Sequence, residues 1–387
     1  MPFSLYALAL AIFVMGTSEF LLAGLLPAIA ADLDVSVGSA GLLISAFALG
    51  MVVGAPLMAA FARRWPPRST LLVCVLVFAA CHVIGAVTSV FGVLLLTRIV
   101  GAVANAGFLA VALTTATALV TPDRTGRAVA ILLSGTTIAT VAGVPGGALL
   151  GTAFGWRAPF WIIAALCVPA ALGVLRGVAP RPAEDRAARD RPRLRSELAL
   201  LATRPLLLAL ALAALVNGGT FAAFTFLAPV VTEVAGLPEL WVPVTLVLFG
   251  VGSFLGVTLA GRLADRHPGV VLGVGGPLLL VGWMATALLA VHPAVLLGLV
   301  LVQGVLSFGV GSTLIARVLL AAAGAPTMGG SYATAALNVG AVVGPALGAA
   351  ALATAEETLA PLGVATALTA IALGLGLLFR RTLVARP

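Results

Sequence analysis

Residues 3–30 read FSLYALALAIFVMGTSEFLLAGLLPAIA, a long, mostly apolar run with a single charged residue, Glu19. An α-helix needs about 20 apolar residues to cross the hydrocarbon core of a bilayer, and this run is long enough. It is too long for a cleaved signal peptide and has no basic leader before it. We therefore expect it to form a membrane-spanning helix.

Similar runs recur along the whole chain and predict twelve spans. Their predicted ranges are 3–30, 38–62, 70–88, 92–121, 127–153, 158–176, 205–232, 240–261, 270–290, 294–316, 327–354 and 358–379. The runs are apolar on every face, whereas the strands of a membrane barrel alternate in polarity over about ten residues. With 61% hydrophobic and 9% charged residues, the sequence predicts an all-α membrane protein.

The basic residues predict the orientation of these spans. All 21 are arginines, and all but Arg98 and Arg157 fall in or directly beside alternate gaps or at the C-terminal end. The positive-inside rule places that side in the cytoplasm, so both termini of this multi-pass protein are expected on the cytoplasmic face of the cell membrane. Because the net charge of +8 follows from this topology, we expect no nucleic-acid partner.

A hydrophilic stretch divides the predicted spans into six and six. We expect an N-terminal six-helix bundle over 1–178, a cytoplasmic linker over 179–203 and a C-terminal six-helix bundle over 204–387. At an offset of 202 the halves align as a repeat, which pairs Gly50 with Gly252 and Gly54 with Gly256. Two bundles that rock around a site in mid-membrane are typical of secondary transporters.

The sequence lacks the patterns of an enzyme or a metal site. It has no H-E-x-x-H motif, no pair of aspartates within a span and no serine and histidine at dyad spacing. Cys74, Cys81 and Cys167 lie within spans without metal-ligand spacing. We therefore expect neither enzymatic activity nor a cofactor. His82, also within a span, is expected to be a packing residue.

Two charged residues inside the spans are candidates for proton coupling. An arginine in hydrocarbon costs at least ~2.5–3.5 kcal/mol, so Arg98 is expected to face the bundle interior and bind an acceptor. Glu19 is the only carboxylate well inside the predicted spans, and its depth in the membrane differs from that of Arg98 by about 8 Å. We predict that Glu19 binds the proton and that Arg98 loads or unloads it by moving. Alternatively, the two form a static buried pair that holds their helices together.

Several motifs resemble those of the major facilitator superfamily over the whole length of the chain. The segment Gly143-Val144-Pro145-Gly146-Gly147, followed by Gly155-Trp156-Arg157, is similar to the signature of the drug:proton antiporters, the exporters of this family. Arg98 and the residues after it resemble the R-x-x-x-G signature of proton-coupled members. In the first half, Arg63 stands where the family loop motif has Asp, and Pro66 stands where it has Gly.

The resemblance extends to the chloramphenicol-resistance exporters of that subfamily. It implies a multidrug-efflux type of protein that exports chloramphenicol or related small drugs against protons and confers antibiotic resistance. It also implies a monomer in the lipid bilayer that uses the proton gradient and no cofactor. The alternative is a facilitator or exporter of a sugar-like or other small metabolite, which would not depend on the gradient.

Two further groups of residues are candidates for binding and gating. Polar and aromatic residues of the spans that suit a cavity for an uncharged aromatic drug are Asn105, Asn217, Phe221, Phe224, Gln303, Phe308, Tyr332 and Asn338. Residues expected to act in gating are Gly143, Pro145, Gly146, Gly147, Gly344, Pro345, Arg64, Asp265 and Arg266. Alternatively, the polar residues brace helices, the phenylalanines face lipid, and the loop arginines only anchor the topology.

Overall fold

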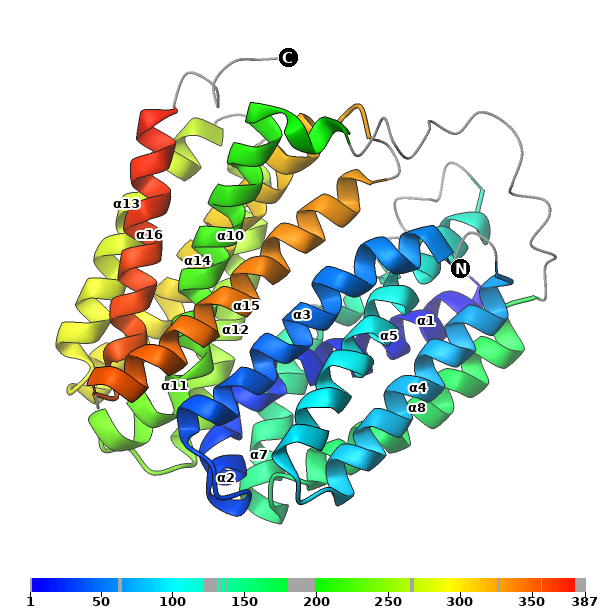
Figure 1. Ribbon diagram of the computed structural model, residues 1–387, viewed down its shortest axis with the longest axis horizontal. Coiled ribbons are helices and arrows are strands. Elements are labelled where there is room, and N and C mark those ends of the chain that lie inside the picture. Colours follow the sequence, from blue (N-terminus) through cyan, green and yellow to red (C-terminus); the bar gives the residue numbers. More distant parts are fainter. Residues whose placement is uncertain are drawn as a thin grey trace. The chain divides into compact units, whose positions relative to one another are not determined.

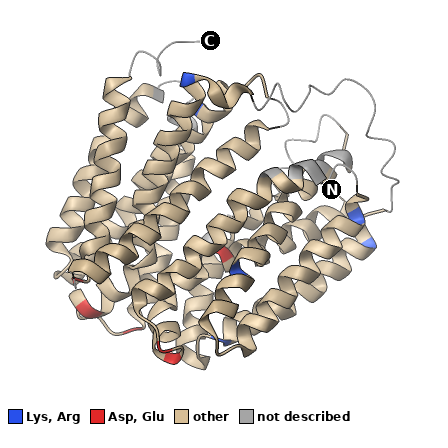
Figure 2. Ribbon diagram, viewed as in Figure 1, with Lys and Arg blue, Asp and Glu red and all other residues tan. Residues whose placement is uncertain are grey.

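The computed structural model describes residues 2–61, 65–121, 131–179 without 133 and 137, 199–264, 268–325, 328–355 and 357–379. These residues form helices and contain no strand (Figure 1). Ten of their helices are long and apolar enough to cross a membrane, and two shorter apolar helices cover Phe3–Glu19 and Val144–Phe154. Figure 2 shows most of the described charged residues at helix ends, as expected for spans in hydrocarbon.

The helices follow the predicted spans in order. In the first half they are α1 (Phe3–Phe20), η1 (Leu21–Gly24), α2 (Leu26–Asp32), α3 (Val37–Phe61), α4 (Pro67–Val87), α5 (Phe91–Ala118), η3 (Ala139–Gly143), α7 (Val144–Phe154) and α8 (Ala158–Gly177). In the second half they are η5 (Leu200–Ala202), α10 (Arg204–Thr225), α11 (Leu227–Pro229), η6 (Val230–Val234), α12 (Trp241–Ala264), α13 (Pro268–Leu289), α14 (Pro293–Ala321), α15 (Gly329–Ala355) and α16 (Ala360–Leu378).

The chain forms two compact units. The first comprises Met1–Val35 and Ala46–Arg191, and the second comprises Ser36–Ser45 and Pro192–Pro387. Helix α3 is therefore divided, since its first turns belong to the second unit. There the Ser45 hydroxyl donates to the carbonyl of Val342 in α15 at 2.9 Å. In the first unit α4 packs against α5 and α8, and in the second α10 packs against α15 and α16.

The predicted continuous spans 3–30 and 205–232 are both interrupted, which corrects the sequence expectation. After α1, the 3-10 turn η1 intervenes before α2, which has Pro27 in its first turn. After α10, the short α11 ends with Pro229 and leads into the π-helical η6. Proline has no backbone N–H, so it is tolerated in a first turn but disrupts a continuing helix. The two prolines lie 202 positions apart (229 minus 27), so the breaks occupy equivalent places in the halves.

Several predicted span ends also differ by a few residues. The span predicted over 92–121 ends earlier, because α5 stops at Ala118. The span predicted over 294–316 continues to Ala321 in α14. Arg317 was expected to mark a loop, but a long basic side chain can lie along a helix end while its charged group reaches the interface.

The predicted repeat corresponds to one close helix crossing formed twice. In each half, two glycines of one helix lie so near the backbone of another that no side chain fits between them. The pairs are Gly50 with Ile99, Gly54 with Val103, Gly252 with Leu301 and Gly256 with Val305. Every member of the first two pairs has its counterpart 202 positions later, for example 301 minus 99. The aligned glycines therefore mark the crossing of α3 with α5 and that of α12 with α14.

Candidate functional site

Arg98 is buried in α5 and is anchored to α1 at Ser18. Its Nη1 donates to the Ser18 hydroxyl at 2.8 Å, and its Nη2 donates to the Ser18 carbonyl at 2.9 Å. The guanidinium carbon also lies 4.3 Å from the centre of the Phe47 ring, a cation–π contact. The Arg98 Nε is buried and has no hydrogen-bond partner among the described residues. Arg98 thus faces the interior of the first unit, as its burial cost requires.

His82 of α4 extends this network. Its Nδ1 lies 2.8 Å from the carbonyl oxygen of Phe78, which can only accept, so Nδ1 carries the proton. Its Nε2 lies 2.7 Å from the Ser18 hydroxyl and must accept from it. The rings of Phe78 and Phe160 lie 4.3 and 5.6 Å away between centroids. His82 therefore packs as expected, but it also takes part in a polar network that the sequence did not indicate.

Glu19 lies beside this network at the end of α1, just before the break in the span. Its side chain is half-buried. No hydrogen bond or ion pair joins it to Arg98 in the part of the chain that the structure describes, although Arg98 acts on it electrostatically. Among the described residues, Arg98 therefore joins its helix to α1 through Ser18 and not through a direct bond to Glu19. Glu19 and Arg98 are neighbours because Arg98 binds the adjacent residue, Ser18.

Three of the candidate binding residues meet in an aromatic cluster of the second unit. Phe221 and Phe224 of α10 have ring centroids 6.2 Å apart. Phe249 of α12 lies 4.9 Å from Phe224 and 6.0 Å from Phe308 of α14. Phe249 was not among the predicted residues. Its signal in the sequence is the repeat, which aligns it with Phe47, the residue beneath Arg98.

The candidate asparagines differ in what their amide groups bind. Asn217 of α10 donates to the carbonyl of Leu337 in α15 at 2.7 Å, and Asn338 donates to Thr334 of its own helix at 2.9 Å. Asn105 makes only a weak contact, from its Nδ2 to the Met51 sulfur at 3.7 Å. Of the three, Asn105 thus has the amide with the most remaining hydrogen-bonding capacity.

Gln303 and Tyr332 are both buried in the second unit. Gln303 of α14 donates to the Leu279 carbonyl of α13 at 3.3 Å, while its Oε1 has no partner among the described residues. This places Gln303 between α13 and α14. No group of three or more His, Cys, Asp or Glu side chains that could hold a metal occurs in the described ranges.

The predicted gating glycines differ in their surroundings. Gly143 faces Thr17 and Gly147 faces Leu21, so the helix containing them lies directly against α1 and η1, whereas Gly146 has no atom within 4 Å of an added Cβ. Gly344 of α15 lies against the carbonyl of Gly218 in α10. Pro145 follows the π-helical η3, a distortion of the kind expected near proline, and Pro345 lies inside α15. Arg64, Asp265 and Arg266 lie outside the described residues.

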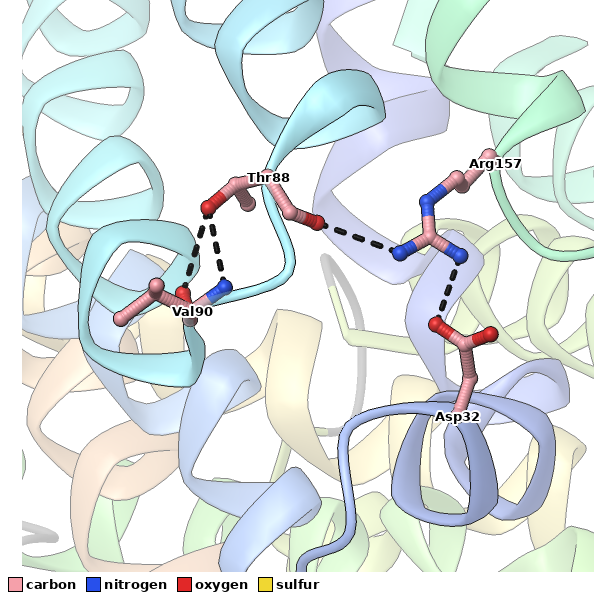
Figure 3. A network of polar contacts seen from close by, with 4 residues as sticks. All are labelled: Asp32, Thr88, Val90 and Arg157. Atoms are coloured by element: carbon pink, nitrogen blue, oxygen red, sulfur yellow. Dashed lines mark hydrogen bonds and ion pairs between the residues drawn. The ribbon is translucent and has the colours of Figure 1, made fainter.

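Arg157 ties three elements together at one end of the first unit (Figure 3). Gly155 ends α7 with a φ of +85°, a conformation that favours glycine and allows the chain to turn sharply. Arg157 then lies 4.3 Å over the Trp156 ring and donates to Asp32 Oδ2 at 2.6 Å and to the Thr88 carbonyl at 3.2 Å. The Gly-Trp-Arg motif thus fixes α2, α4 and α8 to one another.

The second unit contains a polar contact at the equivalent place. The Thr358 hydroxyl donates to Glu233 Oε2 at 2.8 Å, across the same separation of 125 residues as the pair Asp32 and Arg157. Both pairs connect the end of the first span of a half with the start of its sixth. The two contacts thus occupy similar places in the two halves, although their members lie 201 positions apart (233 minus 32) and not the 202 of the aligned repeat, and a neutral hydroxyl stands in place of the arginine.

The sequence matches the Major Facilitator Superfamily over residues 8–345. It is 63% identical to the chloramphenicol resistance protein of Streptomyces lividans over 380 residues, which cover 98% of this chain and 97% of that protein. It is 34% identical to the inner membrane transport protein YdhP of Escherichia coli (strain K12) over 350 residues, which cover 90% of this chain and 89% of that protein.

Solved structures of transporters have a similar fold. A bacterial homolog of the human lysosomal transporter Spinster has a TM-score of 0.78 at 19% identity and covers 98% of this chain and 96% of its own. The nucleoside transporter NupG has a TM-score of 0.75 at 13% identity and covers 100% of both chains. At these identities the likeness concerns the fold alone. With its apolar helices and these relatives, the chain is an integral membrane protein that belongs to the Major Facilitator Superfamily.

Proposed function

We propose that this protein is a proton-coupled antiporter that exports chloramphenicol or related small drugs and so confers resistance to them. The observation that carries the proposal is the Glu19 carboxylate, which has no hydrogen-bond or ion-pair partner in the described parts of the chain. It lies at the break in the first span, beside the buried Arg98. The relative from Streptomyces lividans, named for chloramphenicol resistance, supports the choice of drug.

Glu19 is proposed as the residue that binds and releases the proton. A charged carboxylate within a span carries a large free-energy cost unless it is protonated or paired. Residues of this kind are therefore functional by default. Glu19 is half-buried and therefore open to exchange, and no partner among the described residues holds its carboxylate. Arg98 supplies a fixed positive charge that favours release of the proton.

The aromatic cluster around Phe249 is proposed to contact the aromatic ring of the drug. Aromatic rings stack favourably on a flat aromatic ligand. The hydroxyls of Thr225, next to Phe224, and of Ser307, next to Phe308, are buried without a partner among the described residues. A hydroxylated drug could satisfy them, since a mainly apolar site with a few polar groups is the usual chemistry of such sites.

The proposed topology is the one that the sequence predicts. It consists of twelve transmembrane helices in two six-helix bundles, joined by a cytoplasmic linker over 179–203, with both termini in the cytoplasm. The distribution of arginine supports this orientation, because nearly all of it falls on one side of the spans. The protein is proposed to work as a monomer.

The first test is the accumulation of labelled chloramphenicol in energised cells with and without the protein, before and after addition of a protonophore. Proton-driven export predicts low accumulation only in cells that have both the protein and the gradient. Entry and exit of the drug that the protein speeds equally, with or without the protonophore, would instead favour a facilitator. Equal accumulation in cells with and without the protein would exclude chloramphenicol as the substrate.

Phe249→Ala is expected to weaken drug binding. Removing one aromatic contact costs ~0.5–1.5 kcal/mol in addition to the lost contact area. The apparent KM for chloramphenicol should therefore rise by at least about two- to tenfold, with a smaller effect on the maximal rate. The matched control is Phe254→Ala on the same helix, because the Phe254 side chain is 51% exposed. Equal KM values for the two variants, in protein of equal thermal stability, would exclude Phe249 from the drug site.

A further inference from the structure

Ser18, His82 and Arg98 form a polar network in the interior of the first unit, within the residues that the structure describes. The proposed function gives Ser18 and His82 no role. We propose that these two residues are positioning residues for proton coupling. They hold Arg98 on the Ser18 hydroxyl while Glu19 is protonated, and Arg98 exchanges the hydroxyl for the carboxylate when the proton leaves. This inference rests on the proposed function.

The hydrogen bonds of the network have a fixed direction. Arg98 can only donate, so the Ser18 oxygen accepts at 2.8 Å and the Ser18 proton points to His82 Nε2 at 2.7 Å. The His82 Nδ1 proton then points to the Phe78 carbonyl. Ser18, His82 and Arg98 are all buried, with 1%, 4% and 3% of their surface exposed. In the interior of a bundle such a directed chain of hydrogen bonds orders its side chains, so it defines the resting position of the guanidinium.

The same geometry requires a neutral His82. A second proton on Nε2 would point at the Ser18 oxygen, which already accepts from Arg98, and would leave the Ser18 proton without its acceptor. It would also put a positive charge next to the guanidinium. His82 therefore serves as an acceptor that orients Ser18 and does not carry the transported proton.

Arg98 retains a donor for a second partner. Its Nε is buried and unpartnered among the described residues, and Glu19 is the residue directly after Ser18 on α1. The bond from Arg98 Nη2 goes to the backbone carbonyl of Ser18 and not to its side chain. It can therefore persist while the rest of the guanidinium turns. A charged carboxylate is a stronger acceptor than a hydroxyl, because charge-assisted hydrogen bonds are roughly twice as strong as neutral ones.

Few other charges influence this exchange. From α4 the titratable groups nearest in sequence are Cys81 and His82, while Arg68 and Cys74 lie towards the start of that helix, and from α5 the only charge is Arg98. On α8 the only charge is Arg176 in the last turn, and η3 and α7 contain none. The balance between hydroxyl and carboxylate is thus set by the three residues of the network and Glu19.

The test is chloramphenicol transport by the purified full-length protein in proteoliposomes, driven by an imposed pH gradient and measured across a range of pH. Ser18→Ala removes the competing hydroxyl, so Arg98 should favour the charged carboxylate. The pH midpoint of transport should then move to lower pH by about one unit, which is a tenfold loss of proton affinity. Ser18→Thr keeps a hydroxyl and should restore the midpoint.

His82 is tested in the same assay with two variants. His82→Leu removes the acceptor for Ser18 and should move the midpoint in the same direction by less, whereas His82→Gln can still accept and should stay near the wild type. The matched control is Ser4→Ala, because the Ser4 hydroxyl also joins α1 to α8, at the Gly177 carbonyl, far from Arg98 along the helix. It should leave the midpoint unchanged.

A lower rate with an unchanged midpoint in Ser18→Ala and His82→Leu would overturn the inference and leave Ser18 and His82 as structural residues. If Ser18→Ala does not reach the membrane, the inference is tested by comparing the pH midpoint of His82→Leu with that of His82→Gln. Wild-type transport that does not depend on pH would instead refute the proposed function itself.

Discussion

Glu19→Gln is expected to abolish export of chloramphenicol against its gradient. Glutamine matches the size of the neutral acid but cannot lose a proton, so Arg98 would have no charge to move toward. Gradient-driven export should fall by at least ~100-fold, as expected when a group required in every cycle is removed, while exchange of labelled for unlabelled drug continues. The measurement is efflux from loaded proteoliposomes with and without a pH gradient.

Glu233→Gln is the matched control for this experiment. Glu233 is another carboxylate at a span end, but it is exposed and bonded to Thr358. Its substitution should leave both efflux and exchange close to those of the wild type. If Glu19→Gln retained most of its gradient-driven efflux, the proton would have to bind elsewhere. If both efflux and exchange were lost together, Glu19 would have a structural role.

The sequence predicted the helical membrane class well because the signal is physical and repeated. A span must be apolar along its whole length, whatever it packs against, so ten described helices fall on predicted runs. The interruptions after Phe20 and Thr225 were missed, since hydropathy does not register backbone geometry. The prolines at 27 and 229 were the available signal, and their equivalent places in the repeat made it stronger.

The partner of Arg98 shows where prediction from sequence ends. The rise per residue placed Glu19 and Arg98 at similar depths, which was sufficient to expect them in one region. Successive residues of a helix point about 100° apart, however, and depth does not reveal which of them faces α5. Ser18 and not Glu19 receives the guanidinium. Similarly, the repeat aligned Phe249 with Phe47, but only packing distinguishes a clustered ring from one that faces lipid.

Gly344→Ala is expected to destabilise the second unit strongly. An added Cβ would collide with the Gly218 carbonyl and lie only 2.8 Å from its carbon, so α10 and α15 would have to separate. Backbone atoms cannot turn aside as a flexible side chain can. Overpacking of this kind costs typically ~1–3 kcal/mol, which should appear as a clear fall in the melting temperature of the purified protein.

Gly330→Ala on the same helix provides the control, because nothing lies within 4 Å of a Cβ added there. This variant should melt at or slightly above the wild-type temperature, since alanine favours a helix over glycine. Gly344 was also a candidate for gating, and transport by correctly folded protein distinguishes the two roles. A rate that falls only with the fraction of folded protein indicates packing, whereas a slower rate per folded molecule indicates that the contact between Gly344 and Gly218 must shift in each cycle. Identical melting of Gly344→Ala and Gly330→Ala would contradict the close approach of the two backbones.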